Sequence, residues 1–369
     1  MDDRTAFAHA LVAWQKRSGR HDLPWQHAGK RPDPYRVWLA EIMLQQTQVA
    51  AVIPYYTRFL ERFPTLEALA AAPLDEVMQR WSGLGYYSRA RNLHAAARRI
   101  AADFGGTFPR DVEALVSLPG IGRSTAAAIA VFAFGARAAI LDGNVRRVLA
   151  RVFAIEGLPS QKAVEKRLWE LADMLVPDRD ITAYTQGLMD LGATLCRPAR
   201  PDCAVCPFVD SCMAHLEGRI AELPGRRVRA ALTERAITML VVAHRGTVLL
   251  ERRPPAGIWG GLWSLPEVRA LADGGAKEAR ALAERHGVVE SVERLPSFVH
   301  GFTHFRLVVD VMRLDLAGRN DSSRASKVEA PNADLRWLPC EEADRIGLPA
   351  PVRRLFESSF AKIGVNLSA

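Results

Sequence analysis

Apolar side chains recur at helical spacing through residues 6–215, in short Ala- and Leu-rich segments separated by Gly, Pro and Asp. No alternating strand pattern interrupts them, so we expect an all-α domain over residues 1–220. The predicted helices are 6–17, 35–50, 65–71, 88–104, 111–117, 124–133, 144–154, 161–175 and 181–193.

The pattern changes after AELPGRRVRAALTER (221–235), a polar, basic segment broken by Pro and Gly that predicts an interdomain linker. AITMLVVAHRGTVLLERR (236–253) has two β-rich runs around a His-Arg-Gly turn, which predicts a hairpin. A further strand is expected at 304–316, and a helix at 275–287 lies between them. We therefore expect a second domain of α+β class over 236–360.

Composition agrees with two domains, because 369 residues exceed one typical core and 49% of them are hydrophobic. The start, MDDRTAFAHA, has no basic segment leading into a long apolar run, and the most apolar stretch, 124–141, contains Arg137. We expect a cytoplasmic chain with no membrane span. The net charge of +8 permits a polyanionic partner without identifying one.

Four of the five cysteines lie in one short segment, CRPARPDCAVCPFVDSC (196–212), with the spacing C-x6-C-x2-C-x5-C. Four cysteines so close together in a cytoplasmic chain of this size favour a metal site over disulfides. An iron–sulfur cluster, a zinc ion and reduced structural cysteines all remain possible from the spacing. The candidate ligands are Cys196, Cys203, Cys206 and Cys212, whereas Cys340 stands alone and is expected to be a free thiol.

The segment VSLPGIGRSTAAAIA (116–130) predicts a helix, a tight turn and a second helix, within about 111–133. Pro119 ends the first helix, Gly120 and Gly122 permit backbone conformations that other residues resist, and Ser124 or Thr125 can cap the second. A plain helical hairpin would also need glycines here. The full L-P-G-I-G pattern is the helix–hairpin–helix signature, which binds the DNA backbone without regard to sequence.

Two carboxyl groups stand in unusual surroundings. Glu41 is the only charge between Val37 and Met43, and a carboxyl among apolar residues has a raised pKa, as a general acid requires; a salt-bridged surface Glu is the alternative. Asp142, in AAILDGNVRRVLARV, can simply cap a helix, or can be kept ionised by helix N–H groups and Arg146. A protonated Glu and an ionised Asp together suit cleavage of a glycosidic bond.

Five ordered motifs carry a family resemblance. LPGIGRSTA, LDGNVRRVLAR and the cysteine spacing resemble the helix–hairpin–helix DNA glycosylases of the endonuclease III superfamily. WLAEIMLQQTQV and WSGLGYYSRARNL are similar to the adenine DNA glycosylases, the MutY group. The resemblance runs from about residue 23 to Cys212 and continues more loosely beyond it.

The resemblance implies base excision repair, by removal of adenine mispaired with 8-oxoguanine or guanine, without strand cleavage. Glu41 would protonate adenine at N7 and then activate water, and Asp142 would stabilise the sugar cation or capture it. Tyr86 and Asn144 would help to hold the sugar and Asp142. The base must first be flipped out of the duplex.

Further residues take roles from the same resemblance. Side chains near the lesion, some wedged into the duplex, would be Gln45, Gln46, Thr47 and Leu84. The adenine pocket would include Trp25, Gln26 and Gln186. The cysteines would hold a [4Fe-4S] cluster, and DNA phosphates would be met by Gly120, Gly122, Ser124, Arg146, Arg197 and Arg200.

The resemblance also weighs the alternatives. Bifunctional pyrimidine glycosylase/AP lyases of the superfamily carry a Schiff-base lysine where this chain has Ser124, and Arg146 stands where a lysine is frequent. A non-catalytic DNA-binding protein would not need both Glu41 and Asp142. We therefore expect a monofunctional enzyme, acting as a monomer on double-stranded DNA and associated with the nucleoid.

The second domain resembles a Nudix hydrolase through VLLERRPPAGIWGGLWSLPE (248–267). Its helix carries Glu278 and Glu284 but lacks the paired glutamates that bind magnesium, so no hydrolysis is expected. The resemblance implies recognition of 8-oxoguanine by a loop containing Phe302, Thr303 and His304, where Thr303 replaces the usual serine and keeps its hydroxyl.

Overall fold

The computed structural model describes residues 3–26, 32–227, 231–269, 275–302, 304–320 and 335–357. The chain forms two compact units, and each is described by itself. The first unit comprises 1–71 and 92–229, and the second comprises 72–91 and 230–369. None of the described helices is long and apolar enough to cross a lipid bilayer.

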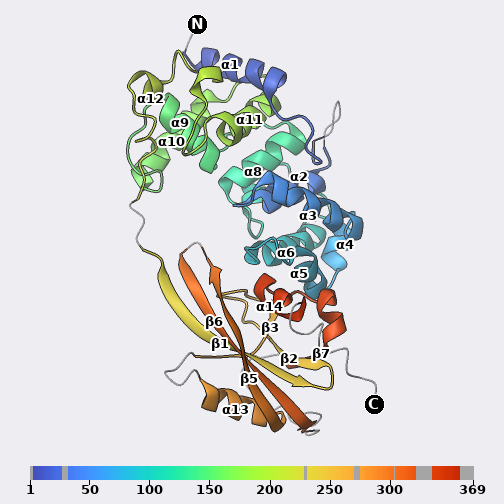
Figure 1. Cartoon of the computed structure of the whole chain (residues 1–369). Helices are drawn as coiled ribbons and strands as arrows, with labels where there is room; N and C mark the ends of the chain where they lie inside the picture. The colour runs from blue at the N-terminus through green and yellow to red at the C-terminus, as the bar shows by residue number, and fades with distance from the viewer. Residues whose placement is uncertain are drawn as a thin grey trace. The chain divides into compact units, whose positions relative to one another are not determined.

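The described residues of the first unit form helices and turns and contain no strand, which confirms the all-α prediction (Figure 1). The helices are α1 (Asp3–Ser18), α2 (Pro34–Leu44), α3 (Val49–Arg62), α4 (Leu66–Ala71), α6 (Ser88–Asp103, in this unit from Asn92), α7 (Val112–Val116), α8 (Arg123–Ile129), α9 (Gly143–Val152), α10 (Lys162–Leu175), α11 (Ile181–Asp190) and α12 (Met213–Leu216). Short π-helical turns extend α8 and α11, at Ala130–Phe134 and Leu191–Leu195.

The predicted helix 35–50 is wrong in one respect, because it is two helices. α2 ends at Leu44, Gln46 takes a left-handed backbone with φ of 56°, and α3 begins at Val49. A residue with a side chain rarely adopts this conformation, so the break between the helices is built at some conformational cost. The apolar spacing continues through the break and hides it from the sequence.

The core of the first unit joins the N-terminal helix to the segment that holds the cysteines. Phe7 on α1 stacks on Phe208, with ring centres 4.5 Å apart and planes 13° from parallel. Phe208 lies between Cys206 and Cys212, and both rings are buried. The cysteine segment is therefore anchored to α1 by apolar packing.

The second unit is built around one sheet with the strand order β3-β2-β1-β6-β5, in which β4 pairs with β1 and β7 with β2. The strands are β1 (Thr233–His244), β2 (Thr247–Arg252), β3 (Trp263–Ser264), β4 (Glu267–Arg269), β5 (Gly287–Gly301), β6 (Phe305–Arg319) and β7 (Leu335–Pro339). Helix α13 (Ala276–Glu284) packs on one face through Ala279 and Ala283 (Figure 1). Helix α14 (Ala350–Leu355) follows β7.

The predicted hairpin at 236–253 is confirmed as β1 and β2, joined through Arg245 and Gly246, both with positive φ. The predicted helix and the strand at 304–316 are confirmed as α13 and β6. β5 was not predicted. It is a long strand at the edge of the sheet and most of its side chains are exposed, so it lacks the apolar alternation that marks a strand in a sequence.

A segment from the N-terminal part of the chain, 72–91, belongs to the second unit. It contains α5 (Leu74–Trp81), where Asp75 accepts two hydrogen bonds of 2.6 Å from the Arg252 guanidinium. The Ser82 hydroxyl donates to the Leu348 carbonyl at 2.6 Å. The loop after α5 is thus held by residues far along the chain.

Candidate active site

Asp142 stands at the start of α9, directly after the buried residues 139–141. Its carboxylate accepts a hydrogen bond from the Val145 N–H at 2.8 Å, so it caps the helix as predicted. Burial raises the pKa of Asp142 above its ordinary value of 3.8, and the N–H groups of Val145 and Asn144 oppose that rise. Burial and these two N–H groups therefore act in opposite directions on the ionisation of Asp142.

Arg147 and Arg146 both lower the pKa of Asp142, and the effect of Arg147, which the sequence analysis did not name, is the larger of the two. The Arg146 guanidinium also donates a hydrogen bond to the Glu165 carboxylate. Arg147 also donates to the Asn144 side-chain oxygen at 2.7 Å. Asn144 is therefore fixed beside Asp142 by the same arginine.

Glu41 lies on α2 among the buried side chains of Val37, Trp38 and Ile42. Burial raises the pKa of Glu41 to about 8, and the nearby charge of Asp142 adds to the rise. Glu41 is therefore mostly protonated at neutral pH, which is the state that a general acid requires.

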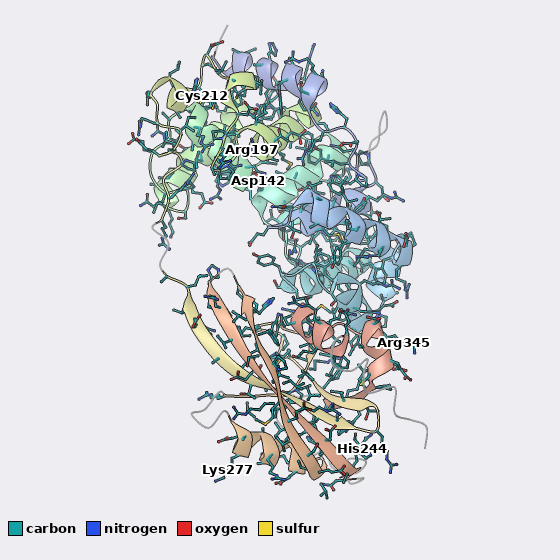
Figure 2. The ribbon with its side chains drawn as sticks, in the orientation of Figure 1. Asp142, Arg197, Cys212, His244, Lys277 and Arg345 are labelled. Carbon is teal, nitrogen blue, oxygen red and sulfur yellow. The ribbon has the colours of Figure 1, made fainter. Side chains whose placement is uncertain are left out.

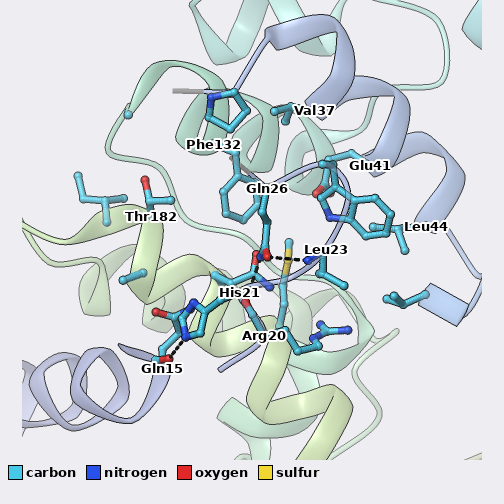
Figure 3. Close-up of a pocket in the computed structure, with 18 of the residues that line it drawn as sticks. Gln15, Arg20, His21, Leu23, Gln26, Val37, Glu41, Leu44, Phe132 and Thr182 are labelled. Carbon is cyan, nitrogen blue, oxygen red and sulfur yellow. Dashed lines mark hydrogen bonds between the residues drawn. The ribbon is translucent and has the colours of Figure 1, made fainter. Parts of the chain in front are cut away.

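Two cavities share Glu41 as part of their walls. The first, which we call the Asp142 cavity, has a volume of about 830 Å³ and is lined by Asp142, Asn144, Ser124 and the 45–48 loop. The second, the Trp25 cavity, has a volume of about 690 Å³ and is shown in Figure 3 with Glu41, Leu44, Phe132 and Gln26 around it. Both cavities are also lined by Arg20, Leu44, Val49 and Met189.

The three residues assigned to the adenine pocket all line the Trp25 cavity with Glu41. Trp25 is buried and packs edge-on against Tyr56, with ring centres 5.4 Å apart. The Gln26 amide is bonded at both ends to backbone groups, accepting from the Leu23 N–H and donating to the Arg20 carbonyl, each at 3.2 Å (Figure 3). Gln186 is buried and donates to Asp190 at 2.8 Å.

The loop between α2 and α3 is tied to the helix–hairpin–helix turn. The Gln45 amide donates to the Gly120 carbonyl and to the Thr125 hydroxyl, both at 3.3 Å. Gln46 is exposed, and together with Gln45 and Thr47 it lines the Asp142 cavity. The residues assigned to the lesion on this loop therefore lie beside the catalytic candidates.

The turn itself uses its two glycines differently. Gly120 has a φ of 79°, and a Cβ added there would lie 2.8 Å from the Asn92 Cβ. Gly122 is extended, with φ of −88° and open space around an added Cβ, so the expectation that it needs a glycine-only conformation is wrong.

The predicted caps of α8 are also wrong. Gly122 occupies the cap position without any side-chain cap, so the first N–H groups of α8 are left for another acceptor. The Ser124 hydroxyl instead accepts a hydrogen bond of 3.0 Å from the Leu141 N–H. Ser124 therefore fixes the backbone just before Asp142.

The four cysteines line one cavity whose other walls are largely apolar, and none of the four forms a disulfide. Burial, with a contribution from neighbouring cysteines, raises the pKa values of Cys203, Cys206 and Cys212, that of Cys206 to about 11. Over the ranges that the structure describes, no three His, Cys, Asp or Glu side chains are arranged to hold a single metal ion. Four thiolates around one cavity are nevertheless the donor set of an iron–sulfur cluster, whose positive charge would relieve their repulsion.

Two arginines of α9 connect this helix, which begins directly after Asp142, to the cysteine segment. Figure 2 labels Asp142, Arg197 and Cys212 in this part of the first unit. Arg147 donates to the Cys196 carbonyl at 2.7 Å. Arg151 is fully buried and donates to the Arg197 carbonyl at 2.8 Å and to the Cys196 sulfur at 3.5 Å. Sequence analysis missed both arginines, although their spacing of four places them on one helical face. The Arg197 and Arg200 side chains are exposed.

In the second unit, Tyr86 and Phe302 line one cavity of about 750 Å³ with Trp259 and His300. Tyr86 is 45% exposed and has a φ of 49°, whereas Leu84 is buried. Phe302 stacks on Phe305 with ring centres 4.6 Å apart. His304 is exposed and does not line this cavity, and Thr303 falls outside the described residues.

Comparison with known proteins finds one family model in each half of the chain. The family model for the HhH-GPD superfamily base excision DNA repair protein matches residues 39–174, and that for the NUDIX domain matches 237–358. An adenine DNA glycosylase of Buchnera aphidicola is 34% identical over 353 residues, which are 95% of this chain and 97% of the relative. The chain belongs to the adenine DNA glycosylase family.

Other members of the adenine DNA glycosylase family are similarly related. The rat and human proteins are 36% and 35% identical to this chain over 96% and 95% of its length, and 78% and 73% of theirs. A solved structure of a thermostable thymine-DNA glycosylase has a TM-score of 0.52 and 32% identity, over 58% of this chain and 97% of that chain. The protein is thus a DNA glycosylase of base excision repair, and the first family match includes Glu41, the helix–hairpin–helix turn and Asp142.

The raised pKa of Glu41 predicts a stability effect with a defined sign. Because the folded-state pKa is near 8 and the ordinary value is 4.5, the favourable contribution of the protonated group is complete below 4.5 and is lost as the pH rises to about 8. Glu41→Gln keeps the shape without the charge. It should therefore raise the free energy of unfolding little near pH 4.5 and by on the order of 2–4 kcal/mol near pH 8.

Urea unfolding of the DNA-free protein at several pH values would measure this difference. Glu61→Gln, at an exposed position of α3, is the matched control for the chemical change. A gain from Glu41→Gln that does not grow with pH, or an equal gain from Glu61→Gln, would contradict the assignment.

Proposed function

We propose that this protein excises adenine paired with 8-oxoguanine or guanine in double-stranded DNA and does not itself cut the strand. The observation that carries the proposal is the Glu41 carboxyl, which lies in the wall shared by the Asp142 cavity and the Trp25 cavity. A flipped adenosine with its base in the Trp25 cavity and its sugar in the Asp142 cavity would place its glycosidic bond beside Glu41.

The two carboxyl groups supply complementary chemistry in this arrangement. Glu41, whose pKa is raised to about 8, donates its proton to adenine N7 and makes the base a neutral leaving group. The sugar then develops positive charge, which favours the ionised form of Asp142. The Val145 N–H holds that carboxylate in place and the charge of Arg147 favours its ionised form while it stabilises or captures the cation, and Glu41 then activates water.

We do not expect lyase chemistry, because it requires an amine beside the sugar. In the described part of the chain neither cavity is lined by a lysine, and the Ser124 hydroxyl oxygen accepts a hydrogen bond from the Leu141 N–H. Without an amine at the sugar no Schiff base forms, and the strand stays intact after the base has left. This disfavours the bifunctional pyrimidine glycosylase alternative.

Recognition of the opposite base is assigned to the second unit. Tyr86 and Phe302 line one cavity with other aromatic side chains, which is suited to stacking on a purine such as 8-oxoguanine. Tyr86 is then a residue of base recognition in addition to its proposed contact with the sugar.

We further propose that Cys196, Cys203, Cys206 and Cys212 hold a [4Fe-4S] cluster. When bound, the cluster would cross-link the segment between its first and last ligands. Arg147 and Arg151 hold the same segment from α9, so that Arg197 and Arg200 remain exposed to DNA phosphates.

Duplexes containing 8-oxoguanine:A, G:A or thymine glycol test the activity, when the labelled strands are analysed with and without alkali. We expect cleavage of the adenine strand only after alkali. Glu41→Gln and Asp142→Asn should each lower the single-turnover rate at least about 100-fold, because each removes an acid or a charge from the reacting bond. Asp103→Asn, in an exposed ion pair with Arg99, is the control and should keep the wild-type rate. Strand scission without alkali, or excision confined to thymine glycol, would refute the proposal.

The cluster is tested by the absorbance of protein purified without oxygen. The wild type should be brown with a broad violet band, and Cys203→Ser should lose most of that band. Cys340→Ser is the matched control and should keep it, because Cys340 belongs to the second unit, whereas the four ligands belong to the first. A colourless wild-type protein that retains zinc would overturn this assignment.

A further inference from the structure

Asp190 is a buried charge that the proposed mechanism does not use. It is the last residue of α11 and is fully inaccessible to solvent. Its carboxylate accepts hydrogen bonds from the Arg20 backbone N–H at 2.8 Å and from the Arg20 Nε at 2.7 Å. The third partner is the Gln186 amide, whose Nε2 donates to it at 2.8 Å.

This third bond fixes which way the Gln186 amide points. An amide has a donor end and an acceptor end of almost the same shape, and its neighbours decide between them. Asp190, paired with the Arg20 guanidinium, is a carboxylate that can only accept. The NH₂ group of Gln186 must therefore face Asp190, and its carbonyl oxygen is left as the end available to the Trp25 cavity, which Gln186 lines.

We propose that Asp190 is a positioning residue for base selection, which locks Gln186 so that the Trp25 cavity presents a hydrogen-bond acceptor to the 6-amino group of the base. The inference rests on the proposed function, since it assumes that the flipped base enters this cavity. Adenine offers an amine donor there, whereas guanine and hypoxanthine carry a carbonyl oxygen at the same place. Two acceptors would then face each other in a buried site, where an unpaired polar group is costly.

The chemistry of residue 190 explains why a charge is buried here. An Asn at this position could donate as well as accept, so it would tolerate either orientation of Gln186. Because a carboxylate can only accept, Asp190 excludes the orientation in which the Gln186 carbonyl oxygen faces residue 190. Gln26, another amide that lines this cavity, does not depend on Asp190, because backbone groups bind both of its ends.

The test compares two substrates that differ only in the amine. Single-turnover excision is measured opposite 8-oxoguanine for adenine and for unsubstituted purine, which lacks the 6-amino group. Asp190→Asn and Gln186→Leu should each slow excision of adenine by about 10- to 100-fold, the range expected for one buried hydrogen bond. Both variants should slow excision of purine less than about 3-fold, since purine has no amine to lose.

The double variant Asp190→Asn/Gln186→Leu separates positioning from general support. It should be no slower on adenine than Gln186→Leu alone, because Asp190 acts through Gln186. Asp103→Asn again serves as the control, and thermal unfolding checks that each variant is folded. Should Asp190→Asn fail to fold, Gln186→Leu alone still tests the amine contact through its adenine-to-purine ratio.

Equal losses on both substrates would overturn the proposal, and so would an Asp190→Asn loss that persists undiminished when Gln186 is already Leu. Failure of the proposed function is distinguishable from these results, because the wild type would then excise neither base.

Discussion

Glu41 and Asp142 are two carboxyl groups in one buried site, where each makes ionisation of the other less favourable. Burial alone would protonate both, and the reaction needs one proton and one negative charge. The difference between them is local, because Glu41 has only apolar neighbours on α2, whereas Asp142 receives helix N–H groups and the charge of Arg147. The surrounding structure keeps Glu41 in an apolar environment and Asp142 in a polar one, although the two residues are close together.

The need to hold Asp142 in this environment explains why the helix–hairpin–helix turn and the cysteine segment both bind α9 or the residues just before it. Ser124, from the helix–hairpin–helix turn, holds the backbone at Leu141, and Arg147 and Arg151 hold the cysteine segment. The elements assigned to gripping DNA are thus joined to the residue assigned to the sugar cation through a few hydrogen bonds. A small displacement of the helix–hairpin–helix turn or of the cysteine segment would therefore also move Asp142.

The sequence predicts those features whose cause is local. The apolar neighbours of Glu41 are visible in the sequence, and so is the position of Asp142 before Gly and Asn at the start of a helix. The helices of the first unit are likewise predicted by their apolar spacing. Features that depend on contacts between distant segments were missed or misassigned. Arg147, which favours the ionised form of Asp142 more than Arg146 does, is bonded to the Gly192 and Cys196 carbonyls, and no local pattern reveals those distant partners. The role of Asp190 likewise depends on Arg20, which only the fold brings near it.

The pH dependence of single-turnover adenine excision tests the central claim most directly, since it reports the proton on Glu41 during the reaction. We predict a rate that holds through neutral pH and declines only as the pH rises above about 8, where Glu41 loses its proton. A rate that instead falls as the pH rises through about 4.5, the ordinary value for a glutamate, would show that Glu41 is ionised at neutral pH and does not act as the acid.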